Sequence, residues 1–274
     1  LRSLLRRSPM RRRTTRALIV AAGVILAATS LGSAQTPTLT FHDLATMTRH
    51  PLGRMQARGA MGQTGSIMVT ELPPGLKTTP HHHHQEQMML GLDGGMHYQM
   101  AGKPYPLGRL TAAIALPNIE HGNLNETAAP ATCIEFQPVL RPDWFPPHPR
   151  RAREGAPAPV AIPAGRTVTE DFSAPAGWRA APGGARSKSL SGDTMRLTLW
   201  DLSAASAPVD LTSGAAVERF VFVVDGQASI AEGTAQRTIG KEMLVIVSPA
   251  AKSVRLSSVK AGAALLAVFE PLKP

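Results

Sequence analysis

Four consecutive histidines, at positions 81–84, are the most distinctive chemical feature of the sequence. Glu86 and Gln87 follow them closely, and His121 lies further along the chain. Imidazole nitrogens, together with carboxylate or amide oxygens, are common ligands of divalent first-row transition metals. The residue types therefore predict a metal site. The sequence contains no Ser-His-Asp arrangement and no phosphate-binding loop that would indicate another chemistry.

The alternation of side chains along a strand divides these residues into two candidate ligand sets. The odd-numbered set consists of His81, His83 and Gln87. The even-numbered set consists of His82, His84 and Glu86. A strand slip of one residue would exchange the two sets. The odd-numbered and the even-numbered sets are therefore alternatives, because only one of them can face the interior of the fold.

The stretch from Gly75 to Gly94, GLKTTPHHHHQEQMMLGLDG, resembles the first cupin motif, G-x5-H-x-H-x3-E-x6-G, with Gln87 in place of Glu. The later segment ALPNIEHGNLN resembles the second motif, P-x3-H, through Pro117 and His121. The motif spacing favours the odd-numbered set.

The cupin resemblance implies a jelly-roll barrel with a divalent transition metal (Fe, Mn, Ni, Cu or Zn) at its centre. The residues matching the motifs imply the ligands His81, His83, Gln87 and His121. A local bulge in the strand would bring Glu86 to the site instead, so the choice between Glu86 and Gln87 stays open here.

An internal repeat divides the chain into two halves. A shift of 132 positions places EQMMLGLDGG, from Glu86, on ERFVFVVDGQ, from Glu218. Short alternating apolar runs bounded by Gly and Pro in both halves are typical of strands. We predict an all-β protein with two tandem cupin double-stranded β-helix barrels. The expected order is a signal peptide at 1–34, a metal-binding domain at 36–145, a Pro- and Arg-rich linker at 146–165 and a degenerate cupin domain at 166–274.

The second half lacks the histidines of the first. The same shift places Ser213, Ala215, Arg219 and Ser253 at the positions of the four expected ligands. We therefore expect a second barrel without metal, in which Arg219 fills the equivalent space through an ion pair. Cys133, the single cysteine, lies in the strand-like run ATCIEF and is expected to be buried.

Residues 1–34 combine seven arginines and no acidic residue with the apolar stretch ALIVAAGVILAATSLGSA. This pattern predicts a secretory signal peptide cleaved after Ala34, by either the general or the twin-arginine route, and a periplasmic or secreted protein. An uncleaved membrane anchor is the alternative. The formal net charge is +10, but the sequence without these seven arginines has 22 basic and 19 acidic residues, so the remainder is nearly neutral. We therefore expect no nucleic-acid partner and, after cleavage, no membrane partner.

Three imidazoles and one amide carry no negative charge, so a bound divalent cation would keep its full charge and attract an anionic oxygen. We therefore expect a small, anionic substrate and a dioxygenase or another oxidoreductase. The alternatives are a non-catalytic metal- or ligand-binding protein and a metal-assisted isomerase or lyase. A homodimer formed through sheet edges is also open.

Overall fold

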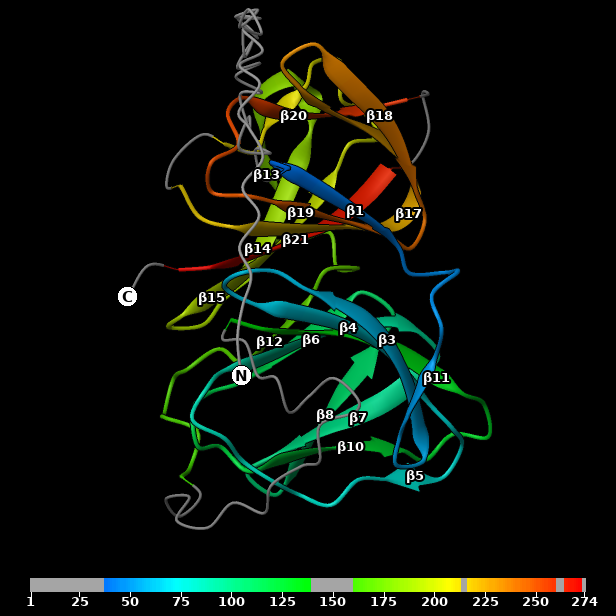
Figure 1. The fold of residues 1–274 in the computed structure, drawn as a ribbon. Helices are drawn as coiled ribbons and strands as arrows, with labels where there is room; N and C mark the ends of the chain where they lie inside the picture. The colour runs from blue at the N-terminus through cyan, green and yellow to red at the C-terminus, as the bar shows by residue number, and fades with distance from the viewer. Residues whose placement is uncertain (1–36, 139–159, 213–215, 260–263, 273–274) are drawn as a thin grey trace, which may run out of the picture. The chain divides into compact units, whose positions relative to one another are not determined.

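The computed structural model describes residues 37–138, 160–212, 216–259 and 264–272. Strands form two barrels, and the helical structure within these ranges is the short 3-10 turn η2 (Pro182–Gly184) (Figure 1). The predicted all-β fold of two jelly-roll barrels is confirmed. Nothing helical in this part of the chain has the length and hydropathy needed to cross a bilayer. The predicted signal peptide lies outside the described residues.

A seven-stranded and a four-stranded sheet form the first barrel. In order, the larger sheet contains β12 (Thr169–Asp171), β9 (Thr111–Ala115), β6 (Gln87–Asp93), β11 (Ala131–Gln137), β4 (Ser66–Leu72), β3 (Met55–Met61) and β2 (His50–Leu52). The smaller sheet contains β5 (Leu76–Lys77), β10 (His121–Asn125), β7 (Gly95–Met100) and β8 (Lys103–Gly108). The neighbouring strands are antiparallel, as is usual in a jelly roll.

The second barrel consists of one ten-stranded sheet. Its strands are β1 (Leu39–Asp43), β13 (Arg179–Ala180), β14 (Arg186–Ser191), β15 (Met195–Asp201), β16 (Val209–Asp210), β17 (Arg219–Glu232), β18 (Ala235–Gly240), β19 (Met243–Val247), β20 (Val254–Ser258) and β21 (Ala264–Pro271). The first half of β17 pairs with β19 and β21, and its second half pairs with β18 and β20. This long strand therefore connects the two faces of the barrel.

The sequence repeat corresponds to a repeated bend in the structure. Gly94 and Gly226, the glycines of the two Asp-Gly pairs, have φ angles of 70° and 72°. These angles favour glycine because a side chain there is strained. At Gly94 a Cβ atom would also lie 2.6 Å from the carbonyl oxygen of Pro130. Each Asp-Gly pair therefore marks the same turn of its barrel.

The two barrels exchange strands. Strand β1, in the predicted first domain, pairs with β19 of the second barrel from Leu39↔Val247 to Asp43↔Met243. Strand β12, in the predicted second domain, pairs with β9 of the first barrel. Local alternation does not encode which sheet edge a strand will join, so the sequence did not reveal this exchange. The domain boundaries themselves stay predictions, and most of the linker, 146–159, lies outside the described residues.

Aromatic side chains link the cores of the two barrels. The ring of Phe136 in β11 lies 5.2 Å from that of Phe220 and 5.3 Å from that of Phe269, both in the second barrel. All three side chains are fully buried and belong to one apolar cluster that includes residues from both halves. A second cluster fills the remainder of the second barrel. The shared cluster makes the two barrels parts of one packed unit.

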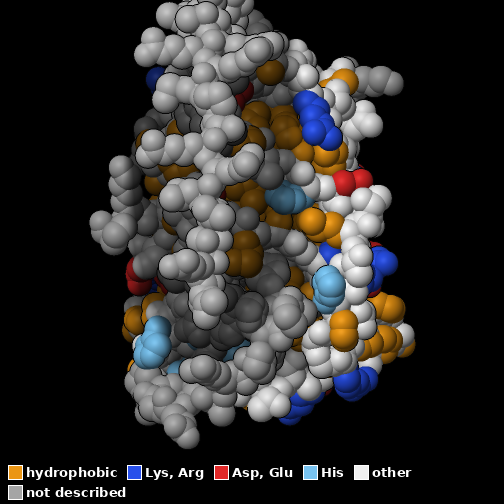
Figure 2. Space-filling view, in the orientation of Figure 1, with side chains coloured by type: hydrophobic (Ala, Val, Ile, Leu, Met, Phe, Trp, Pro, Cys, Tyr) orange, Lys and Arg blue, Asp and Glu red, His pale blue; other side chains and the backbone are white. Residues whose placement is uncertain are grey.

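The charged side chains visible on the face in Figure 2 are dispersed. Lys and Arg side chains of the described residues lie there in separate groups, with some Asp and Glu side chains among them. This distribution agrees with the near balance of charge outside the first 34 residues.

Candidate metal centre

The structure brings the four residues of the predicted ligand set together. One ring nitrogen from each of His81, His83 and His121 lies within 4.8 Å of the other two. Gln87 Oε1 lies 2.9 Å from His83 Nε2 and 3.0 Å from His121 Nε2. His83, Gln87 and His121 are buried, and His81 is half-buried. Their geometry is consistent with the predicted ligand set, and their role as ligands stays a prediction.

Backbone pairing fixes the positions of these side chains. The backbone nitrogens of His81 and His121 donate to each other's carbonyl oxygens at 2.9 and 2.8 Å, which forms an isolated bridge beside β10. Gln87 begins β6 and pairs with Ala115 of β9. His83 lies in the connection between them, where its carbonyl oxygen accepts from the backbone nitrogen of Asn118 at 2.8 Å. The site is therefore built where two strands begin and a loop crosses between them.

Backbone carbonyl groups determine which nitrogen of each imidazole is protonated. The Nδ1 atoms of His81, His83 and His121 lie 3.2, 2.6 and 2.7 Å from the carbonyl oxygens of Thr79, Gln85 and Ile119, respectively. A carbonyl oxygen can only accept, so each Nδ1 donates. A neutral imidazole has a single N–H, which leaves its Nε2 with a lone pair. All three rings are thus held in the tautomer that a metal ligand requires, by the type of contact that orients histidine ligands.

The donor set fits a divalent cation. The lone pairs of His83 Nε2 and His121 Nε2 face Gln87 Oε1, which is also an acceptor. The amide nitrogen of Gln137 reaches His83 Nε2 only at 3.4 Å, so a positive charge among the three acceptors would stabilise them further. Metal–nitrogen bonds of about 2.0–2.1 Å place neighbouring ligand atoms about 3 Å apart. The distances around Gln87 Oε1 match this spacing, so the residues present fit the metal that the motif implies.

Glu135 is a fifth polar group at the site, and it was not among the residues predicted from the sequence. Its side chain is 4 % exposed, and Gln87 Nε2 donates to its Oε2 at 2.8 Å. The hydroxyl of Thr70 donates to the other oxygen at 2.9 Å. The four expected ligands carry no negative charge themselves, but a carboxylate contacts the amide of one of them. A single acidic residue inside the apolar run ATCIEF, two positions from the buried Cys133, was the available signal.

Two neighbours of Glu135 have perturbed acidities. Burial raises the pKa of Tyr98 well above its usual value, and the charge of Glu135 raises it further. The same two causes, burial first, raise the pKa of the Cys133 thiol. Cys133 is fully buried, as predicted, and remains a protonated thiol at neutral pH. The Tyr98 ring lies 5.6 Å from that of His121, and its hydroxyl has no hydrogen-bond partner among the described residues.

A cavity of about 260 Å³ opens onto the cluster. His81, Gln87, Asn123 and Glu135 belong to its lining, and the Asn123 Oδ1 atom is buried without a hydrogen-bond partner in the described part of the chain. The remaining lining residues are Leu52, Gly53, Arg54, Met55, Leu76, Lys77, Thr78 and Thr79. Two of these, the exposed Arg54 and Lys77, are basic. The cavity therefore combines polar groups beside the histidines with positive charge among its exposed lining residues.

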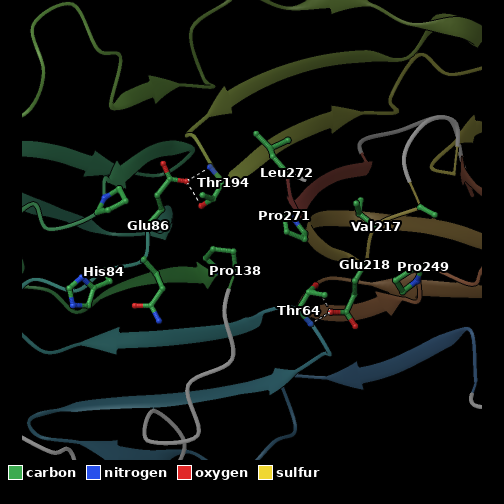
Figure 3. Close-up of a pocket in the computed structure, with 13 residues that line it drawn as sticks. Thr64, His84, Glu86, Pro138, Thr194, Val217, Glu218, Pro249, Pro271 and Leu272 are labelled. Carbon is green, nitrogen blue, oxygen red and sulfur yellow. Dashed lines mark hydrogen bonds between the residues drawn. The ribbon is translucent and has the colours of Figure 1, made fainter. Parts of the chain in front are cut away.

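The alternative ligand set is not brought together. Glu86 is fully buried, and its carboxylate accepts from the backbone nitrogens of Asp193 and Thr194 at 2.7 and 2.8 Å and from the Thr194 hydroxyl at 2.7 Å. Figure 3 shows Glu86 pointing to Thr194, with His84 beside it at the same pocket. Within the described ranges, His82 Nε2 is buried without a hydrogen-bond partner. Glu86 therefore contacts the second barrel, whereas Gln87 contacts the histidines.

The second barrel has a contact equivalent to that of Glu86. Glu218 accepts from the backbone nitrogens of Gln63 and Thr64 at 2.8 and 2.7 Å and from the Thr64 hydroxyl at 2.8 Å (Figure 3). Each glutamate therefore binds a hairpin turn of the other barrel. No motif in the sequence predicts this pair of contacts, although the two turns, Gly-Gln-Thr at 62–64 and Gly-Asp-Thr at 192–194, are similar.

The equivalent interior position of the second barrel holds an ion pair. Arg219 is 7 % exposed, and its Nε atom lies 3.1 Å from Glu270 Oε2. Glu270 Oε1 also accepts from Arg196 Nε at 2.8 Å. The expected ion pair of Arg219 is thus present. Ser213 and Ala215, two of the positions equivalent to the predicted ligands, lie outside the described residues.

Two jelly-roll barrels, with a three-histidine cluster in the first, define the class of protein to which this chain is similar. The family model of the Cupin domain matches residues 68–136, so this part of the chain is a cupin domain. The matched stretch contains the three clustered histidines and Gln87, Glu135 and Asn123. No curated protein sequence matches the chain.

Solved structures with a similar fold cover both barrels. The protein Ylba from E. coli has a TM-score of 0.63 at 10% identity, covering 86% of this chain and 91% of its own. A variant of oxalate decarboxylase OxdC from Bacillus subtilis has a TM-score of 0.61 at 9% identity, with coverages of 86% and 78%. A variant of salicylate 1,2-dioxygenase from Pseudoaminobacter salicylatoxidans, in complex with gentisate, has a TM-score of 0.60 at 14% identity, with coverages of 85% and 81%. At these identities the likeness concerns the fold.

Proposed function

We propose that the protein is a metal-dependent cupin oxidoreductase, with dioxygenase as the first activity to test, that acts on a small organic anion in the first barrel. The observation that carries this proposal is that three imidazoles lie together and are already in the tautomer that metal binding requires. Each Nδ1 is hydrogen-bonded to a backbone carbonyl, and two Nε2 atoms face the oxygen of Gln87. Such an arrangement is costly to maintain without a cation.

His81, His83, Gln87 and His121 would hold the metal, for which Fe, Mn, Ni, Cu and Zn are the candidates. When bound, a divalent metal supplies a Lewis acid and open coordination positions for substrate. The protein's own residues determine the environment of the substrate. The buried Asn123 Oδ1 atom offers an acceptor to a donor group of the substrate, and the apolar Met55 and Leu76 belong to the same lining.

The lining of the cavity supports an anionic substrate of modest size. A volume of about 260 Å³ is at the small end for ligand pockets, which favours a compact aliphatic acid or a single aromatic ring. Arg54 and Lys77 are both exposed and would attract a carboxylate or phenolate. The similar dioxygenase structure holds gentisate, and the similar decarboxylase is named for oxalate. Both compounds are organic acids.

Metal content and oxygen consumption test the proposal together. The purified chain should contain one divalent metal per molecule and should consume O2 with at least one member of a panel of hydroxybenzoates and small aliphatic acids. Release of CO2 without O2 uptake would indicate a lyase instead, which the similarity to oxalate decarboxylase makes the second candidate. Stoichiometric metal without turnover would indicate a binding protein, and absence of metal would reject the metal centre.

We also propose that the protein is exported to the periplasm or secreted, on the basis of the arginine-rich start and the apolar stretch that follows it. Cell fractionation and the mass of the exported chain test this proposal. A mature chain that begins at Gln35 would support cleavage after Ala34, whereas a membrane-bound chain that retains residues 1–34 would indicate an anchor. Light scattering of the same material would show whether the protein is a homodimer.

A further inference from the structure

The carboxamide of Gln87 has two distinct neighbourhoods. Its oxygen lies 2.9 and 3.0 Å from the Nε2 atoms of His83 and His121, and its nitrogen lies 2.8 Å from Glu135 Oε2. Gln87 is 3 % exposed. Fixed protein groups therefore contact both ends of the amide.

Without a metal, the histidines by themselves would favour the opposite orientation of the amide. Their Nε2 lone pairs are acceptors, so the NH2 group of a rotated Gln87 would donate to them. That orientation would block the site with a donor, because an N–H group cannot coordinate a cation. The same rotation would turn the amide oxygen toward Glu135 Oε2, which also accepts. The carboxylate therefore opposes the rotation.

Glu135 is itself held in place. The Thr70 hydroxyl donates to Oε1 at 2.9 Å, and Gln87 donates to Oε2, so both oxygens accept hydrogen bonds. Thr70 is fully buried, and Glu135 is nearly so. A buried carboxylate with both oxygens accepting is the form that can discriminate between the two ends of an amide.

The second barrel shows which residues change together. Glu135 pairs with Met89, and the equivalent pair in the second barrel is Val268 with Val221. Gln87 corresponds to Arg219. The second barrel thus has neither the amide nor the carboxylate at these positions. The barrel fold therefore does not itself require a glutamate at position 135, and its presence goes with that of Gln87.

We propose that Glu135 is a positioning residue that holds the Gln87 oxygen toward the metal and supplies one negative charge beside it, so that Glu135 determines the affinity of the site for a divalent cation. This inference rests on the proposed metal centre. It assigns no ligand role to Glu135, which acts through Gln87.

The affinity of metal-free protein for Zn²⁺, measured by competition with a chromophoric chelator, tests the inference. We expect Glu135→Gln to bind Zn²⁺ about 10- to 100-fold more weakly, the loss typical of residues that orient metal ligands. The new amide can donate to a rotated Gln87, so it no longer selects the orientation. The double variant Gln87→Glu/Glu135→Gln should recover affinity, because the amide introduced at position 135 donates to a carboxylate that now faces the histidines.

Glu86→Gln is the matched control. It makes the same chemical change at a buried glutamate next to Gln87, but its contacts are with Asp193 and Thr194, so the Zn²⁺ affinity should not change. Circular dichroism of each variant verifies that it is folded. The d–d absorption of bound Co²⁺ should shift in Glu135→Gln and remain unchanged in Glu86→Gln.

Equal affinities of the wild type and Glu135→Gln would overturn the inference while leaving the metal centre intact. A double variant that binds no better than Glu135→Gln would overturn it as well. If the wild type does not bind Zn²⁺ or Co²⁺ at the histidines, the proposed function fails first, and the inference fails with it.

Discussion

In the first barrel Gln87 begins β6 and faces two imidazoles, whereas in the second barrel Arg219 begins β17 and faces Glu270. The strand positions are equivalent, and the neighbouring glutamates, Glu86 and Glu218, make the same kind of contact. The chemistry of the two interiors is nevertheless different. One interior has converging acceptors that could hold a cation from outside, and the other contains a cation as a side chain.

This difference separates what the fold provides from what the residues add. Both barrels provide a buried position at the start of a central strand, and the side chains placed there decide whether it becomes a site or a structural ion pair. In the second barrel the guanidinium of Arg219 compensates the carboxylate of Glu270. Removing or exchanging the groups that distinguish the two interiors tests this view.

Loss of one imidazole should have the largest effect. His83→Ala removes a buried Nε2 from the cluster and should abolish stoichiometric metal binding, as measured by elemental analysis of purified protein. His84→Ala is the matched control, because it changes the adjacent histidine of opposite parity and should leave metal content unchanged. Full metal content in the His83 variant would show that the cluster has been wrongly assigned.

Breaking the ion pair of the second barrel should affect stability and leave metal content alone. Arg219→Met removes the buried cationic partner of Glu270, leaves the partly exposed Arg196 beside it, and should lower the free energy of unfolding by about 3 kcal/mol. Urea denaturation measures the change. Arg186→Met, which breaks a pair between an exposed arginine and the partly buried Asp201 in the same barrel, should cost less than about 1 kcal/mol. Equal losses in the two variants would contradict a special role for the buried pair.

The two interbarrel glutamates should behave alike. Glu86→Gln and Glu218→Gln each weaken hydrogen bonds to a hairpin turn of the other barrel, and each should lower the free energy of unfolding by about 2 kcal/mol. Chemical denaturation of the single variants and of the double variant provides the comparison. If only one of the two variants lost stability, the two contacts would have the same geometry but different energetic contributions.

The smallest effect concerns acid stability. Burial acts to raise the pKa of Glu71, but hydrogen bonds from Arg49 and Arg58 outweigh it and the pKa is lowered. A carboxyl with a lowered folded pKa stabilises the protein above its unfolded pKa, about 4.3 for Glu, and loses this contribution as the pH falls through the folded value. Glu71→Gln should therefore be less stable than the wild type at pH 7.

Asp201 in the second barrel behaves in the same way. Burial acts to raise its pKa, but hydrogen bonds from Arg186 and Ser203 outweigh this effect, so the pKa is lowered. Asp201→Asn should therefore show the same trend. For both variants the difference from the wild type, about 0.5 kcal/mol at pH 7, should shrink when urea midpoints are measured at progressively lower pH. A difference that grows on acidification would refute the assigned sign.

Much of the fold could be predicted because it rests on local patterns. The alternation of apolar residues indicated the strands, and the Asp-Gly pairs at 93–94 and 225–226 indicated the repeat, since both glycines occupy the same left-handed conformation. The motif spacing favoured His83 and Gln87 over Glu86, although the expected strand through the histidines is absent from this described segment and His83 lies in a connection before β6. These features depend on neighbours in sequence, which the sequence displays directly.

The features that were missed depend on partners far apart in the chain. Glu135 contacts Gln87 across 48 positions, and Glu86 contacts Thr194 across 108. Neither contact follows from a motif, because a single glutamate in a strand does not indicate which side chain it will meet. Only the three-dimensional structure shows that a carboxylate, that of Glu135, contacts one of the uncharged predicted ligands.

The exchange of β1 and β12 has a consequence for how the chain folds. Thr40 pairs with Ile246, so the first described strand cannot pair until nearly the whole polypeptide has been synthesised. Until then its hydrogen-bonding edge is open, and contacts of such large sequence separation form slowly. Either half produced alone would lack a strand that the other half carries. The kinetic unit of folding is therefore the pair of barrels, and a nascent chain with only the histidine-bearing half completed would be prone to intermolecular strand pairing.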